Sequence, residues 1–158
     1  YGASADQVEI SITAIEALGG VTDLTDGDGA SVTAGSTDIY TDAGDAIYTL
    51  GTAATTVLGI TIAGAMTEAV VEAALINTGT EDLTSSAAGH SDGDAMLLLV
   101  DRTGEASVGT VLALMVFLSD VNADTALTAG TIDIIFLANL GTADATGSAN
   151  TANFDLIA

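Results

Sequence analysis

The sequence predicts an all-β protein, built as an antiparallel β-sandwich or a jelly-roll-like arrangement. Apolar runs of strand length recur roughly every 10 to 20 residues and are separated by Gly, Asp and Thr, which is the spacing of a sandwich or a barrel. Few of these runs carry the 3.6-residue period of a helix. The chain has 158 residues, the usual size of one domain. We therefore expect a single β-sandwich domain over residues 1–158.

Each expected strand has its own pattern. Residues 7–15 alternate between apolar and polar side chains, which predicts a strand with one buried face. Residues 96–100 and 111–118 are apolar without interruption, which predicts strands buried on both faces. Residues 130–140 alternate again, so we expect one wet face there. The two apolar runs lie within longer expected strands at 95–102 and 110–119. Two further strands are expected at 36–41 and 46–51, around a turn at 42–45. The last two are expected at 56–64 and 153–157.

Residues 65–76 fit two patterns. Met66, Val70 and Ala73 have helical spacing, and the high Ala content also favours a helix. The same segment alternates as a strand, and its paired valines and β-rich surroundings favour that alternative. The sequence leaves one short helix near residues 65–76 open and slightly favours a strand.

Two polar stretches interrupt the strands. Residues 77–94 form the longer one and carry the only histidine of the chain, His90. Residues 141–153 form the second one, directly before the last expected strand. We expect both to be exposed loops, with the His90 side chain in solvent.

The charge balance is the most unusual property of the chain. It has 22 acidic residues and a single base, Arg102, which gives a formal net charge of -21. Phosphate groups are bound through Lys and Arg, so we expect no nucleic-acid partner and no binding to a membrane surface. The longest apolar run is also too short to span a bilayer. Salt or divalent cations would relieve the self-repulsion of such a chain, which favours a saline or extracellular setting.

The sequence lacks the usual signs of catalysis. Cysteine is absent, so there is no thiolate chemistry and no disulfide framework. A single histidine, without a G-x-S-x-G nucleophile motif, does not indicate a hydrolase. Glycine-rich stretches have no lysine to meet a phosphate. We therefore expect a protein that is not an enzyme and has no cofactor, apart from the calcium ion considered next.

An acidic loop at residues 23–29, with the sequence DLTDGDG, is the strongest candidate metal site, and residues 91–94 and 119–124 are weaker copies of it. Asp23, Asp26 and Asp28 have the spacing of calcium ligands, and the glycines allow the backbone to wrap around a hard cation. The closing bidentate Glu of an EF-hand does not follow. A solvated Asp- and Gly-rich turn explains the same residues, so both interpretations stay open.

Arg102 is the second candidate functional residue. It follows Asp101 and lies near Glu105 in the sequence, which indicates a structural ion pair at a hairpin corner. The alternative is a contact between subunits, because one guanidinium can hold an acidic group of a partner through two hydrogen bonds.

Two resemblances bear on function. The succession of DAIYTLGTAATTVLGITIAG, DGDAMLLLVDRTGEASVGTVLALMVFLSD and TAGTIDIIF, within residues 40–137, resembles the capsid decoration (cement) proteins of tailed phages. That resemblance implies a β-sandwich subunit that clamps neighbouring capsomers and has no active site. The segment FLSDVNADTALTAGTIDI, residues 117–134, is similar to the start of camelysin/TasA-type filament proteins, although here it lies near the carboxyl end.

The sequence thus predicts a structural virion protein that decorates and stabilises a capsid. Its partners would be copies of itself and the capsid protein, in a homo-oligomer. The first alternative is an extracellular filament or surface-layer subunit assembled by strand donation, with residues 7–15 or 153–158 as the terminal donor that extends into a neighbouring subunit. The second alternative is a calcium-dependent binding module.

Overall fold

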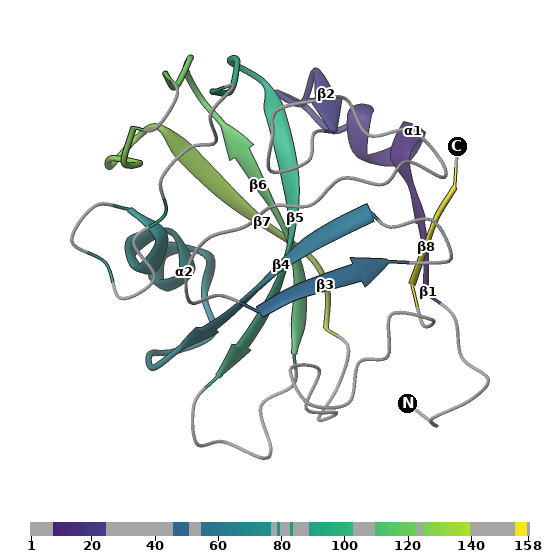
Figure 1. Ribbon diagram of the computed structural model, residues 1–158, viewed down its shortest axis with the longest axis horizontal. Coiled ribbons are helices and arrows are strands. Elements are labelled where there is room, and N and C mark those ends of the chain that lie inside the picture. Colours follow the sequence, from purple (N-terminus) through teal and green to yellow (C-terminus); the bar gives the residue numbers. More distant parts are fainter. Residues whose placement is uncertain are drawn as a thin grey trace.

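The computed structural model (Figure 1) describes residues 8–24, 46–50, 55–76, 79, 83, 89–102, 110–122, 125–139 and 154–157. These residues lie mainly in strands, with two short helices among them, so the all-β prediction is confirmed at that level. The expected strand at 36–41 lies outside the described residues. The strands are β1 (Val8–Ser11), β2 (Asp23–Leu24), β3 (Ala46–Leu50), β4 (Thr55–Ile62), β5 (Asp94–Arg102), β6 (Val111–Phe117), β7 (Ile132–Asn139) and β8 (Phe154–Ile157), and the helices are α1 (Ile12–Glu16) and α2 (Glu68–Leu75).

A six-stranded sheet forms the centre of the molecule. Its strand order is β3-β4-β5-β6-β7, and β2 pairs with β5 beside this path. The pairs β3–β4, β5–β6 and β6–β7 are antiparallel, whereas β4–β5 and β2–β5 are parallel. The prediction of a purely antiparallel arrangement is therefore wrong for the described strands, because β5 is flanked by one antiparallel and two parallel partners.

Both faces of this sheet are covered, as the continuous apolar runs of β5 and β6 predict. Successive side chains of a strand point to opposite faces, so each strand supplies two cores. One core joins alternate residues of β4, β5 and β6 to the buried residues Val71, Ala74 and Leu75 of α2. The other joins the remaining residues of β5 and β6 to β1, α1 and β2. The run 111–118 is buried only as far as Phe117, since Leu118 is 49% exposed.

Helix α2 provides the connection that the parallel pair β4–β5 requires. Parallel neighbours cannot be joined by a tight turn and need a crossover segment, which is usually a helix. Thr67 caps α2, with its hydroxyl oxygen accepting a bond from the Val70 N–H at 3.4 Å. Val71, Ala74 and Leu75 then bury one helical face. The short helix left open near 65–76 is confirmed, and the preference for a strand there is wrong.

Only the first part of the strand expected at residues 7–15 is a strand. β1 ends at Ser11, whose hydroxyl oxygen accepts a bond from the Ala14 N–H at 3.2 Å and so caps α1. Ile12 and Ile15 lie three residues apart and are both buried on one face of α1. The alternating pattern of residues 7–15 therefore changes to a helical one after Ser11, because the cap ends the extended backbone.

The two terminal strands form a sheet of their own. β1 and β8 pair in parallel, with Val8 opposite Phe154 and Ser11 opposite Ile157. Figure 1 shows this pair at the margin of the molecule, beside α1, and Ile10 of β1 packs in the core that β5 and β6 share with α1. The predicted strand at 153–157 is thus confirmed, and its partner is the other end of the chain.

A side chain from α2 binds one edge group of the central sheet. β7 is the last strand in the described order, and its Phe136 N–H donates to Glu68 Oε1 at 3.0 Å. Open N–H groups at a sheet edge recruit further strands, and this bond occupies one of them.

Candidate functional site

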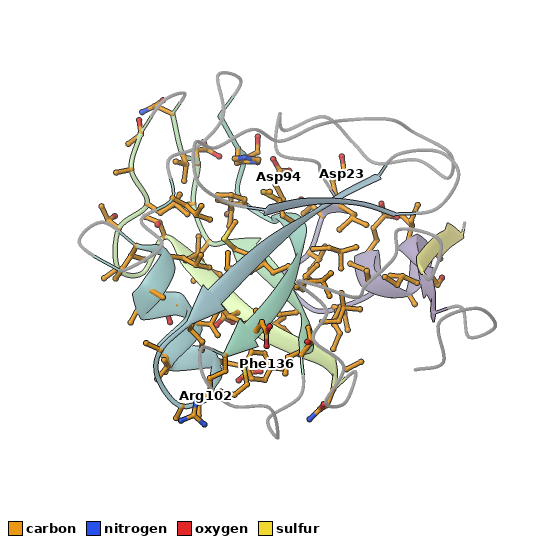
Figure 2. The ribbon with its side chains drawn as sticks, turned by 60° about the horizontal axis from the view of Figure 1, so that its bottom comes forward. Asp23, Asp94, Arg102 and Phe136 are labelled. Carbon is orange, nitrogen blue, oxygen red and sulfur yellow. The ribbon has the colours of Figure 1, made fainter. Side chains whose placement is uncertain are left out.

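Acidic residues from three parts of the chain meet at the end of the sheet where β5 begins. Asp23 of β2 is the register partner of Asp94, the first residue of β5, and Figure 2 shows both at the same end of the sheet. Asp120, which follows β6, accepts a bond from the Asp92 N–H through its Oδ1 at 3.0 Å. We call Asp23, Asp92, Asp94 and Asp120 the acidic end.

A tight turn at residues 91–94 organises this end. The Asp94 N–H donates to the Ser91 carbonyl at 3.1 Å, and the Ser91 N–H donates to Asp94 Oδ2 at 2.7 Å. Gly93 occupies the third position with φ +87°, a left-handed value that glycine adopts without strain. The Gly93 N–H donates to the Phe117 carbonyl and its own carbonyl accepts from the Thr22 N–H, each at 2.8 Å. The turn therefore links β5, the end of β6 and the segment before β2.

His90 is buried beneath this turn, so the prediction of a solvent-exposed histidine is wrong. Its side chain is 1% exposed, and its ring stacks on Phe117 with centroids 4.1 Å apart and an interplanar angle of 8°. The backbone groups of His90 and Val121 exchange bonds of 2.9 and 2.8 Å. Nothing in the local sequence marks this burial, because the residues that hold the ring belong to other segments of the chain.

The imidazole has one unsatisfied nitrogen. His90 Nδ1 is buried without a hydrogen-bond partner, and the nearest acidic oxygen, Asp94 Oδ2, is 4.0 Å away. Burial lowers the pKa of His90 below its ordinary value of 6.5, while the negative charge of Asp94 acts in the opposite direction and only reduces the shift. A lowered pKa favours the neutral ring at pH 7.

A pH prediction follows from this lowered pKa. The folded state binds the His90 proton less tightly than the unfolded state, so its stability is complete above about pH 6.5 and falls as the pH decreases toward the folded pKa. Because a single proton is involved, the unfolding free energy can change by at most about 1.4 kcal/mol per pH unit. We expect His90→Phe, which keeps the aromatic stack, to remove this loss. Urea unfolding of both proteins at several pH values between about 7.5 and 5 would measure it.

The composition of the chain simplifies this experiment, because His90 is the only histidine and there is no cysteine to titrate in that range. Most carboxylates stay ionised above pH 5, so their protonation would not hide the effect. Curves of unfolding free energy against pH that run parallel in wild type and variant would contradict the assignment to His90.

The predicted calcium ligands are only partly placed. Asp23 lies at the acidic end, next to Asp94, whereas Asp26 and Asp28 lie outside the described residues. Asp94 and Asp120 direct carboxylate oxygens at backbone N–H groups of the 91–94 turn. Among the residues that the structure describes, no group of three or more His, Cys, Asp or Glu side chains has the arrangement of a metal site. The calcium site at Asp23, Asp26 and Asp28 stays a prediction.

Arg102 lies at the opposite end of β5 from the acidic end (Figure 2). A strand of nine residues places its two ends about 25 Å apart, beyond the Debye length of physiological salt. The single cation therefore does not neutralise the acidic end. Its backbone N–H donates to Asp101 Oδ1 at 2.7 Å, and the predicted interface role of Arg102 stays a prediction, as Glu105 lies outside the described residues.

Comparison with known proteins adds no relative. A scan against protein families, a search of curated proteins and a search of solved structures each gave no match. Within the described part of the chain, neither helix has the length and apolarity that crossing a membrane requires.

Proposed function

We propose that this protein is a structural, non-enzymatic subunit of an ordered assembly, and specifically a decoration protein that stabilises the shell of a virion. The separate two-stranded sheet of β1 and β8 carries the proposal. This pair, formed by the first and the last described strands, lies at the margin of the molecule (Figure 1). The pair contains only two strands, so a neighbouring subunit that adds a strand to it would gain hydrogen bonds and buried area.

The chemistry of the chain supports the same proposal. Asp94 and Asp120 of the acidic end accept hydrogen bonds from the 91–94 turn, and His90 is enclosed in the core, so these three side chains have structural roles. A net charge of -21 keeps free subunits apart, and this barrier to association is lowered by salt. The sequence texture of residues 40–137, which resembles decoration proteins of tailed phages, supports the virion as the site of assembly.

The fold proposal is one domain over residues 1–158 with a sandwich-like arrangement. The β1–β8 pair would form the second layer over one face of the central sheet. Burial of Ile10 of β1 in the same core as Leu97 and Leu114 supports this arrangement.

An extracellular filament is the second candidate function, and the terminal position of β1 and β8 favours it. A strand donated from one subunit to the next extends an assembly without limit when the contact is head-to-tail. In the two-stranded sheet, β1 and β8 each have one hydrogen-bonded neighbour, which leaves an edge for such a contact.

Electron microscopy of the native source, with antibody labelling of this chain, would distinguish these functions. Label on closed shells supports the decoration protein, and label on fibres supports the filament subunit. Purified protein that stays monomeric at all concentrations, in both low and high salt and with added capsid shells, would contradict both.

A further inference from the structure

We infer that β8 is the strand that this protein exchanges between copies, so that β8 of one copy pairs with β1 of its neighbour. The inference rests on the proposed assembly function and identifies the contact through which that assembly forms. The partner is therefore a second copy of this chain.

β1 is the fixed member of the pair. Ile10 is 6% exposed and packs in the core beneath α1. The cap at Ser11 joins β1 to α1 without an intervening loop, and Ile12 and Ile15 hold that helix in the same core. Moving β1 would expose all of these side chains, so β1 is the acceptor.

β8 is the member that can leave. Among the described strands its hydrogen-bonded partner is β1 alone, in a register of four residues from Phe154 to Ile157. The four-residue register limits the number of hydrogen bonds that hold β8 in place. An exchanged β8 would form the same hydrogen bonds with the neighbour's β1, so the exchange conserves the pairing energy, which is what makes swapping a low-cost route to oligomers.

The chain is long enough for the exchange. Residues 140–153 connect β7 to β8, and fully extended they could span at most about 50 Å. A compact domain of 158 residues has a radius of gyration of about 15 Å. The greatest reach of the connection is therefore more than twice this radius. Its sequence contains no Pro and many small residues.

Exchange should depend on salt. Glu9 and Asp155 are register partners on the two strands, and this pairing is the same within one copy and between two. The net charge of -21, in contrast, opposes only the approach of a second copy. High ionic strength screens that repulsion, so we expect it to favour exchange.

Introduced cysteines would test the exchange, because the chain has none of its own. Glu9→Cys and Asp155→Cys are made as two separate variants, mixed at high concentration in high salt, partially unfolded and refolded together, and then oxidised. If β8 exchanges, the mixture gives a disulfide-linked dimer on a non-reducing gel that neither variant gives alone. Adjacent strand positions have the Cα separation that a disulfide needs. A mixture of Thr13→Cys, on the exposed face of α1, with Asp155→Cys is the off-register control and should give no such dimer.

The double variant Glu9→Cys/Asp155→Cys separates this inference from the function on which it rests. Oxidised at low concentration, it should lock β8 within its own copy as a linked monomer, and this locked protein should lose the ability to assemble. A locked protein that assembles like the wild type would overturn β8 exchange and leave the assembly function intact. The absence of a dimer in the mixture, with or without a linked monomer, would also overturn the exchange. A wild type that never assembles would overturn the proposed function itself.

Discussion

Phe117→Ala is expected to lower the free energy of unfolding by about 3–5 kcal/mol, the range for truncating a large buried aromatic residue. Phe117 is 1% exposed and is among the largest fully buried side chains of the described core. Its removal leaves a cavity and also takes away the ring on which His90 stacks. The His90 imidazole would then lose its main packing partner, while its unsatisfied Nδ1 stays buried.

Leu118→Ala is the matched control for this variant. Leu118 is adjacent in sequence but 49% exposed, so its truncation should cost less than about 1 kcal/mol. Urea unfolding followed by circular dichroism would measure both variants, and unchanged m-values would show that the unfolded states are comparable. Equal losses for the two variants would contradict the placement of Phe117 in the core.

Gly93→Ala is expected to lower the free energy of unfolding by about 2–5 kcal/mol, the sum of a conformational and a packing cost. Gly93 has φ +87°, a left-handed conformation that costs an L residue about 1–2 kcal/mol. An added Cβ would also lie 2.5 Å from Thr22 Oγ1 and 2.7 Å from its Cγ2, and overpacking of this kind costs about 1–3 kcal/mol. Either the Thr22 side chain or the turn at 91–94, with its bonds to Phe117 and Thr22, would have to shift.

Gly130→Ala separates the two causes. Gly130 has φ +80°, and a Cβ there would meet nothing within 4 Å, so only the conformational cost of about 1–2 kcal/mol should appear. Gly93→Ala combined with Thr22→Ala should recover part of the loss, because the clashing atoms are gone. Additive effects of the two substitutions in a double-mutant cycle would show that no clash exists.

The central strands could be predicted from the sequence because their pattern is local. A continuous apolar run such as 96–100 can be shielded from water only if both of its faces are covered, and the structure covers both. The alternation in 130–140 likewise predicts the exposed Asp133 between the buried Ile132 and Ile134. In these segments the local pattern indicates the buried face, although the face of β7 that carries Asp133 also packs Ile135 and Leu137 against the second core.

The candidate site could be predicted only in part. Asp23 was identified from its spacing to Asp26 and Asp28, but its placement beside Asp94 comes from the parallel pairing of β2 with β5. The burial of His90 depends on Phe117 and Val121, which lie in other elements. A polar stretch of sequence does not show which of its side chains a distant core will enclose.

By itself, the sequence determined the mainly β character, the positions of the central strands, and the acidic surface with a single cation. The tertiary structure decided which strands are parallel, that residues 68–75 form a helix, and that the two ends of the chain pair with each other. The physical reason is the range of the interactions involved. Polarity and spacing act between neighbours along the chain, whereas strand partners are selected by contacts between segments that folding alone brings together. For β1 and β8, those partners include a second copy of the same chain if the proposed exchange occurs.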